Sequence, residues 1–163
     1  MSKRLYVTPY RCIDCKVCEQ ACSLAKTPVP GIPAKPRVQT FKVDDQTNFV
    51  LLCLQCDEAS CQKVCPTDAL VRNPETGAIE VNDRCIGCGF CVQACPFGCM
   101  DYDDIHNEYI KCDVCKGDPA CAKYCPTGAL VWDEKAWTDQ EAKERTEKKS
   151  TDPFSIALEM AKK

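Results

Sequence analysis

The sequence has little of the apolar material that normally builds a hydrophobic core. Its 163 residues are 45% hydrophobic when cysteine is counted, but without the 17 cysteines only about a third of the chain is apolar. Small domains with so little apolar surface usually need covalent or metal cross-links to stay folded. We therefore expect the cysteines, about a tenth of the residues, to hold the chain together.

Long hydrophobic runs are missing as well. The longest, residues 49–54, is far shorter than the roughly 20 residues of a membrane-spanning helix, so direct membrane insertion is not expected. Residues 1–10 include basic side chains but no apolar stretch and no small-residue cleavage site, which argues against a secretory signal. These absences predict a cytoplasmic protein. Cytoplasmic thiols stay reduced and an odd number of cysteines cannot all pair within one chain, so metal binding is favoured over disulfides.

Sixteen of the cysteines form four regularly spaced quartets. The first and third share the tight spacing C-x2-C-x2-C-x3-C and also match at positions that have no ligating atom. The second and fourth are looser, and each is followed by Pro-Thr-x-Ala-Leu-Val. The chain therefore reads as a duplicated unit of one tight and one loose quartet. In chain order the quartets are Cys12, Cys15, Cys18 and Cys22; Cys53, Cys56, Cys61 and Cys65; Cys85, Cys88, Cys91 and Cys95; and Cys112, Cys115, Cys121 and Cys125.

The tight spacing is the bacterial-type ferredoxin signature. Three thiolates at C-x2-C-x2-C wrap a short loop around three iron atoms of a cubane, and the fourth cysteine ligates another cluster. Proline follows the fourth cysteine in three quartets, whereas Ser23 follows Cys22, which we interpret as a local change in the turn and not as a lost ligand. Structural zinc fits poorly, because it favours two well-separated pairs of ligands for each ion. The quartets therefore predict four [4Fe-4S] clusters as cofactors.

Two residues with ligand chemistry lie outside this pattern. Cys99, four residues after Cys95, is expected to be a small buried residue and not a ligand. The single histidine, His106, lies in the polar stretch 103–108 and is expected to be a solvated loop residue. Neither is needed to complete a quartet.

The segments between the quartets predict an α+β fold. Residues 69–72 and 78–81, joined by a turn at 73–77, predict a β-hairpin that makes quartets two and three one compact unit. Quartets one and four then close on each other around that unit. Residues 27–33 form a proline-rich loop, either a stiff connector or a binding surface, and residues 37–43 are strand-like.

After Trp132 the composition shifts to charged residues. Residues 138–141 resemble a capping box that opens a polar helix to about Lys149. A short apolar segment, residues 154–160, follows a second helix-start signal at 151–153. This charged helical tail, residues 133–163, is expected to dock on a partner, with a latch on its own body as the alternative.

The alternation of tight and loose quartets, with Cys-Pro-Thr-x-Ala-Leu after the loose ones, resembles the four-cluster electron-transfer subunits of multisubunit oxidoreductases. The resemblance covers residues 3–132. It implies two bacterial-ferredoxin-like modules related by a pseudo-twofold axis, one inserted in the other: residues 50–108 inside, and residues 1–49 plus 109–132 outside. Quartet one would share ligands with quartet four, and quartet two with quartet three. The implied ligand sets are Cys12, Cys15, Cys18 with Cys125; Cys112, Cys115, Cys121 with Cys22; Cys53, Cys56, Cys61 with Cys95; and Cys85, Cys88, Cys91 with Cys65.

The same resemblance implies a function and partners. In its short length, without a membrane anchor, and in the motif at residues 111–121, the chain is most similar to the small subunits of tungsten aldehyde oxidoreductases. The corresponding subunits of carbon monoxide dehydrogenase, formate dehydrogenase and hydrogenase follow. A large tungsten- or molybdenum-containing subunit would carry out the catalysis, and a flavin-containing or other redox subunit is a further implied partner. This chain, with no residues arranged as nucleophile, base or substrate pocket, would carry single electrons. A free-standing polyferredoxin is the alternative.

Charge argues against nucleic acid as a partner. The formal net charge is −3. Sixteen thiolates and four oxidised cluster cores would bring the loaded protein to about −11. Such a protein is repelled by a phosphate backbone.

Overall fold

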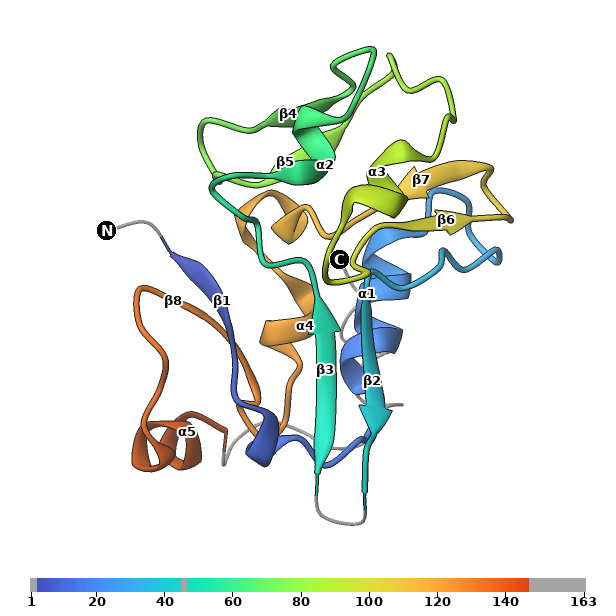
Figure 1. The fold of residues 1–163 in the computed structure, drawn as a ribbon. Helices are drawn as coiled ribbons and strands as arrows, with labels where there is room; N and C mark the ends of the chain where they lie inside the picture. The colour runs from blue at the N-terminus through green and yellow to red at the C-terminus, as the bar shows by residue number, and fades with distance from the viewer. Residues whose placement is uncertain (1–2, 45–46, 147–163) are drawn as a thin grey trace.

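The structure is a computed structural model that describes residues 3–44 and 47–146 (Figure 1). The strands in this part pair into two-stranded antiparallel sheets. The pairs are β1 (Arg4–Val7) with β8 (Leu130–Asp133), β2 (Val38–Lys42) with β3 (Asn48–Leu52), β4 (Leu70–Arg72) with β5 (Ile79–Val81), and β6 (Asp101–Asp103) with β7 (Glu108–Ile110). The α-helices are α1 (Val17–Lys26), α2 (Ser60–Lys63), α3 (Phe90–Ala94), α4 (Ala120–Lys123) and α5 (Asp139–Thr146). Two short 3-10 helices are η1 (Pro9–Arg11) and η2 (Val114–Gly117).

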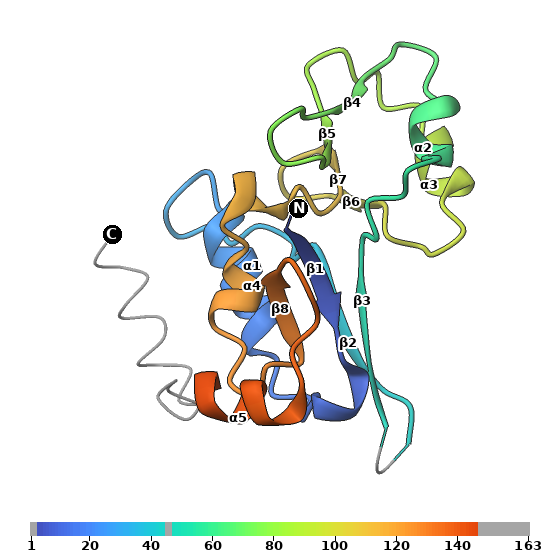
Figure 2. The same ribbon diagram turned by 90° about the vertical axis from the view of Figure 1, so that its left-hand side faces the viewer.

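The elements gather into two lobes that are visible from both directions (Figures 1 and 2). One lobe holds β4, β5, α2 and α3, and the other holds β1, β8, β2, β3, α1, α4 and α5. Each lobe has its own small core of buried residues, and cysteines belong to both cores or pack against them. The thin apolar content of the sequence is thus divided between two cores that have cysteines in their walls.

The larger lobe joins distant parts of the chain. β1 pairs with β8 from Arg4↔Asp133 to Val7↔Leu130, and the N–H of Thr8 continues the pairing by donating to the carbonyl of Ala129 over 2.8 Å. Helices α1 and α4 pack against each other beside this sheet. Quartet one therefore lies next to quartet four, although about a hundred residues separate them in the sequence.

Several predicted elements are present. The hairpin is confirmed, because β4 and β5 pair with Leu70 opposite Val81, and β2 matches the strand-like stretch. The capping box is confirmed by a reciprocal pair of bonds, in which the N–H of Thr138 donates to Glu141 Oε2 over 2.8 Å and the N–H of Glu141 donates to Thr138 Oγ1 over 3.3 Å. The expected module boundary at residue 50 falls inside β3.

The change expected after Cys22 is present, because α1 replaces the turn and continues through Ser23 to Lys26, and the Ser23 Oγ donates to the carbonyl of Ala34 over 2.6 Å. The expectation for the single histidine is wrong. His106 is not a solvated loop residue. Its side chain is only 13% exposed, and its Nδ1 lies 3.0 Å from Oδ2 of the buried Asp103. The buried carboxylate of Asp103, three residues earlier in the same hairpin, holds the His106 ring out of solvent.

The first part of the tail packs on the body. Arg11 forms an ion pair with Asp139 at 2.6 Å, and Tyr10 donates to the same carboxylate over 3.0 Å. Ala142 of α5 is buried. The apolar segment 154–160 lies outside the described residues. Within the described part, no helix is both long and apolar enough to cross a membrane.

Candidate metal centres

The sixteen cysteines of the quartets gather into four groups, which we call sites 1 to 4. Each group combines three cysteines of one quartet with the fourth cysteine of another. Site 1 is Cys12, Cys15, Cys18 and Cys125; site 2 is Cys22, Cys112, Cys115 and Cys121; site 3 is Cys53, Cys56, Cys61 and Cys95; and site 4 is Cys65, Cys85, Cys88 and Cys91.

Sites 3 and 4 are visible as cavities in the smaller lobe. All four cysteines of site 3, together with Ala59, Met100 and Cys99, are among the residues that line a cavity of about 140 Å³. The four cysteines of site 4 line a second, smaller cavity of about 20 Å³. Helix α2 carries Cys61 of site 3, helix α3 carries Cys91 of site 4, and the two helices pack against each other. Both cavities therefore bring together sulfurs from quartets two and three.

The cysteines of sites 1 and 2 are identified as neighbours because they raise one another's pKa values. Burial raises the pKa of Cys18 to about 12, and Cys125, Cys15 and Cys12 add to the shift. Burial likewise raises the pKa of Cys121 far above its usual value, and Cys112, Cys22 and Cys115 add to it. Like charges act on a pKa in this way only when they are close. Quartets one and four thus contribute to the same two groups.

The first C-x2-C loop of every quartet makes the same turn. The residue before the second cysteine has a left-handed backbone, with φ of 53° at Asp14, 52° at Gln55, 73° at Gly87 and 49° at Val114. Only glycine adopts this conformation freely, and other residues pay about 1–2 kcal/mol. Val114 is β-branched and therefore the least suited of the four. Strain that is retained at equivalent positions in repeated loops is typical of functional sites.

Backbone N–H groups donate to the sulfur of the fourth cysteine in each quartet. The donor is Ala69 for Cys65, at 3.2 Å, and Cys99 for Cys95, at 3.3 Å. Burial acts to raise the pKa of Cys65, but the bonds from the backbone of Ala69 and Thr67 outweigh it and the pKa is lowered. Such donors stabilise the charged form of the sulfur, which is the form that ligates a metal.

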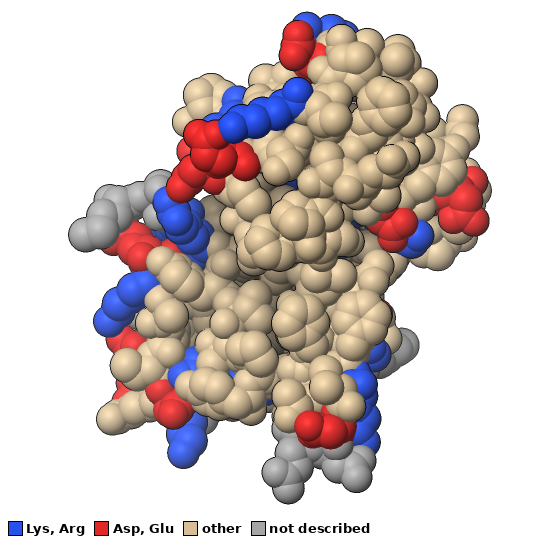
Figure 3. All heavy atoms as spheres, in the orientation of Figure 1, with Lys and Arg blue, Asp and Glu red and all other residues tan. Residues whose placement is uncertain are grey.

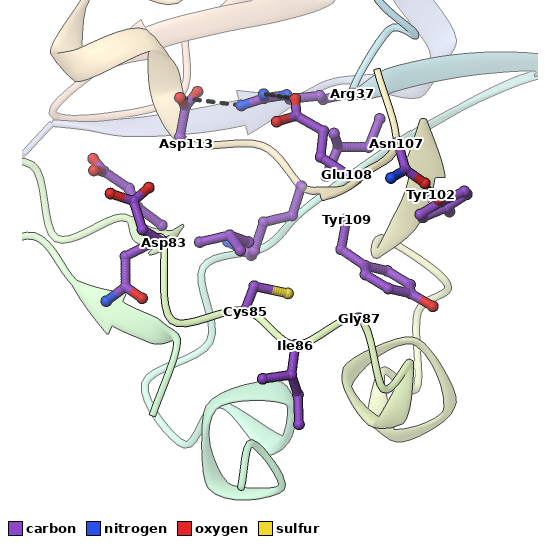
Figure 4. A pocket seen from close by; sticks show the side chains of 15 residues that line it. Arg37, Asp83, Cys85, Ile86, Gly87, Tyr102, Asn107, Glu108, Tyr109 and Asp113 are labelled. Carbon is purple, nitrogen blue, oxygen red and sulfur yellow. Dashed lines mark hydrogen bonds and ion pairs between the residues drawn. The ribbon is translucent and has the colours of Figure 1, made fainter. Parts of the chain in front are cut away.

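The open side of site 4 faces a cleft of about 730 Å³ (Figure 4). The sulfur of Cys85 points into it, and Tyr109 lines it from β7. On the far wall, Arg37 lies between Asp113, at 3.2 Å, and Glu108, at 3.9 Å. Cys85 and Cys88 are exposed, whereas the other cysteines are buried or half-buried. Site 4 is therefore the group that solvent reaches most easily.

The donor set fits an iron–sulfur cluster better than a single ion. No three His, Cys, Asp or Glu side chains in the described ranges are arranged to hold one metal ion. A structural zinc ion needs four ligands around one centre, with sulfurs about 2.3 Å from it. A four-iron cluster instead binds each thiolate at a different corner, so its ligands stand further apart. Four groups of four thiols without a common centre match the second case.

Cys99 lies at site 3 without completing it. Its Sγ donates to the carbonyl of Leu52 over 3.2 Å, and burial raises its pKa to about 12. The carbonyl of Leu52 already engages this thiol, and the cavity is lined by four other cysteines, one for each corner of a cluster. The geometry is consistent with a structural role for this residue.

Two family models of 4Fe-4S proteins match the chain. Residues 44–135 match the model of a 4Fe-4S dicluster domain, and residues 9–26 match that of a 4Fe-4S binding domain. The chain belongs to the 4Fe-4S dicluster family. Multiple [4Fe-4S] clusters are accordingly its cofactors.

Several relatives are named as subunits of oxidoreductases. The chain is 35% identical over 120 residues to the polyferredoxin-like subunit of the aliphatic sulfonate oxidoreductase of Pyrococcus furiosus, covering 73% of this chain and 69% of that protein. It is 32% identical to the formate dehydrogenase iron-sulfur subunit of Wolinella succinogenes, covering 71% and 62%. It is 30% identical to protein NrfC of Escherichia coli, covering 90% and 72%. The dicluster chain is thus an electron-transfer subunit of the kind found in oxidoreductase complexes, consistent with no catalytic site of its own.

Some features of the sites are not apparent from cysteine spacing. The left-handed turns could have been found, because Gly87 and Gly89 of quartet three align with Asp14 and Lys16 of quartet one, and all four have positive φ. The N–H of Arg37, which donates to Cys22 over 3.2 Å, has no signal in the sequence. The buried Lys111 is also missed, since the residue before Cys112 carries no distinguishing pattern.

Proposed function

We propose that this chain is the electron-transfer subunit of a multisubunit oxidoreductase and that sites 1 to 4 each hold one [4Fe-4S] cluster. The lining of the two cavities is the observation that carries the proposal. Each contains three cysteines of one quartet and the fourth of its partner quartet, which is the ligand exchange of two-cluster ferredoxins. When bound, each cluster accepts and donates one electron at a time.

Cysteines of neighbouring sites affect one another, which supports a row of clusters that runs from site 1 through sites 2 and 3 to site 4. Burial is the main cause of the raised pKa of Cys121 in site 2, and Cys18 of site 1 adds to it. Burial also raises the pKa of Cys112 in site 2 to about 12, and Cys53 of site 3 adds to that shift. Sites 3 and 4 are joined by the packing of α2 on α3. The exposed Cys85 and Cys88 make site 4 the solvent-facing end of the row.

The division into modules follows from the same grouping. We assign sites 3 and 4 to an inserted module, residues 50–108, and sites 1 and 2 to an outer module, residues 1–49 and 109–132. The two separate cores and the pairing of β1 with β8 support this division. A pseudo-twofold axis between the modules would account for the repeated order of tight and loose quartets.

A catalytic partner is supported by the surface of the larger lobe. Phe41 and Phe49 face each other across β2 and β3 and are 45% and 48% exposed. On the face that includes these strands, charged side chains lie mainly along the edges (Figure 3). A permanent partner would cover such apolar side chains, whereas a free carrier would leave them in water. The sulfonate and formate relatives support an oxidoreductase partner. We propose a large tungsten- or molybdenum-containing subunit, with tungsten aldehyde oxidoreductase first, on the resemblance carried by residues 111–121.

Metal analysis of the anaerobically purified protein tests the cluster proposal. Four cubanes require about 16 iron and 16 acid-labile sulfide for each chain. The Cys22→Ser variant removes the ligand that quartet one contributes to site 2 and should lose one cluster. The matched Cys99→Ser variant keeps a donor toward Leu52 and should retain all four. Zinc without sulfide, or loss of a cluster only in the Cys99 variant, would contradict the assignment.

The partner is tested by affinity purification of a tagged chain from the native source. A large subunit that copurifies, with tungsten or molybdenum found by elemental analysis, would support the proposed complex. Recovery of the chain alone with all its iron would favour a free polyferredoxin instead.

A further inference from the structure

Lys111 is a buried cation at the junction of sites 2 and 3. It directly precedes Cys112 of site 2, and it lines the cavity of site 3. Only 3% of the residue is exposed. Its Nζ donates to the carbonyl of Ile79 over 2.7 Å, to the carbonyl of Cys112 over 3.1 Å and to Gln55 Oε1 over 3.2 Å.

These three contacts indicate the ammonium form. An ammonium has three N–H donors and no acceptor, and three oxygens surround it here. A neutral amine would have to point its lone pair at one of them. All three oxygens are neutral, so no carboxylate among these partners balances the charge.

A buried charge without a nearby opposite charge is costly. The two flanking sites supply that opposite charge when loaded, because four thiolates exceed the charge of an oxidised cluster core by about two units.

We propose that Lys111 sets the reduction potentials of the two inner clusters, making those at sites 2 and 3 more positive than they would be without it. This inference rests on the cluster assignment proposed above. Adding one electron makes a site one unit more negative, and a fixed cation beside it stabilises the reduced state. An electron at either inner site would thus be more stable than in a chain that lacks this cation.

Gln55 holds the cation in place. It lies between Cys53 and Cys56 in the loop of site 3, and its Nε2 donates to the carbonyl of Cys112 over 2.6 Å. Its Oε1 accepts from both Lys111 and the N–H of Ile79, the latter over 3.0 Å. The Gln55 side chain therefore ties the loop of site 3 to the first cysteine of the loop of site 2, with Lys111 between them.

The test is a potentiometric titration of the anaerobically loaded full chain, followed by electron paramagnetic resonance. In Lys111→Met the side chain stays unbranched and is one atom shorter, but it loses its charge. Two of the four midpoint potentials should shift to more negative values while the other two stay in place. Lys123→Met is the matched control, because Lys123 is exposed although it lies two residues from both Cys121 and Cys125. Water screens its charge, so it should cause a clearly smaller shift.

Gln55→Glu is the second variant, since it places a carboxylate against the ammonium with little change of shape. It should shift the same two potentials in the same direction, even if Lys111→Met does not fold. The inference would be overturned if the potentials stayed unchanged, all moved together or became more positive. Loss of the two inner clusters in both variants would also overturn it, because Lys111 would then be a residue needed for cluster assembly. Wild-type protein without about 16 iron would instead contradict the proposed function itself.

Discussion

The N–H of Arg37 donates to the sulfur of Cys22 over 3.2 Å, from a position 15 residues further along the chain. For Cys65 and Cys95 the corresponding donor lies four residues away, within the turn that follows the Cys-Pro pair. Quartet one has no such turn, because α1 continues beyond Cys22 to Lys26. The segment before β2 therefore supplies from a distance the hydrogen bond that the other quartets make locally.

Ser23→Pro would restore the Cys-Pro pair in sequence but should destabilise the protein. Proline inside α1 removes a helical N–H and clashes with the preceding turn, at a cost of about 3 kcal/mol. Ser23→Ala is the matched control, because it removes only the bond from Oγ to Ala34 and should cost about 1 kcal/mol. Guanidinium unfolding of the loaded protein measures both. Equal stability of Ser23→Pro and wild type would show that the helix is not required at this position.

The cluster at site 4 should be the first to be lost in air. Cys85 borders both the large cleft and the site 4 cavity, and Cys88 borders the site 4 cavity. Both cysteines are exposed, so oxidants and chelators reach their sulfurs directly. Brief exposure should lower the iron content by about four atoms for each chain before further loss. Alkylation followed by mass spectrometry should label Cys85 and Cys88 before Cys18 and Cys121, which are buried. Uniform labelling of all four would contradict this order.

Complete removal of iron and sulfide should unfold the chain. The described cores are small and contain several cysteines, so the apolar contacts left without the clusters are too few to hold either lobe. Circular dichroism before and after anaerobic chelation would measure the loss. A chelated protein with unchanged secondary structure and a cooperative unfolding transition would contradict the dependence on metal.

Alanine variants of two glycines in quartet three distinguish the cost of backbone strain from the cost of a steric contact. Gly87 and Gly89 have φ of 73° and 74°, so alanine at either should cost about 1 kcal/mol. A Cβ at Gly87 would meet nothing within 4 Å, whereas at Gly89 it would lie 3.0 Å from Oη of Tyr109. Gly89→Ala should therefore lower the free energy of unfolding more than Gly87→Ala and alter the near-ultraviolet dichroism of the tyrosines. Identical effects would mean that Tyr109 moves aside at no cost.

Sequence reasoning succeeded where chemistry is encoded locally. Cysteine spacing predicts iron–sulfur clusters because the ligands of one loop are neighbours in the chain, and the turn residues 73–77 predict the hairpin between β4 and β5. The polar helix α5 begins where its capping residue Thr138 predicts. Each of these features depends on residues that are close in the sequence.

Features that depend on distant residues could not be predicted in this way. The pairing of β1 with β8 joins short segments whose partners are set by the closure of the larger lobe. Ser23 lies in a helix, and its hydroxyl donates to the carbonyl of Ala34, 11 residues away. His106 contacts Asp103, only three residues before it, but that carboxylate also accepts from the N–H of the distant Lys35, over 3.0 Å. Lys111 looks like an ordinary surface residue until the fold surrounds it with the carbonyls of Ile79 and Cys112 and with Gln55.

Two truncations should divide the tail into a part that stabilises the body and a part that serves a partner. A chain ending at Thr146 keeps α5 and the ion pair between Arg11 and Asp139, so its unfolding midpoint and iron content should match those of the full chain. A chain ending at Asp133 loses that carboxylate and leaves the guanidinium of Arg11, whose side chain is only 9% exposed, without its charged partner. Its unfolding midpoint should fall, since an uncompensated charge remains in a poorly hydrated position.

Copurification with the catalytic subunit distinguishes the two roles. If residues 147–163 dock on a partner, both truncated chains should bind it more weakly than the full chain, whereas Asp139→Asn should lower the unfolding midpoint and leave binding unchanged. If the chain ending at Thr146 binds as tightly as the full chain, docking lies on the cluster-bearing body, where the exposed pair Phe41 and Phe49 is the next surface to test. Asp139→Asn thus separates the two roles, because the carboxylate pairs with Arg11 of the same chain.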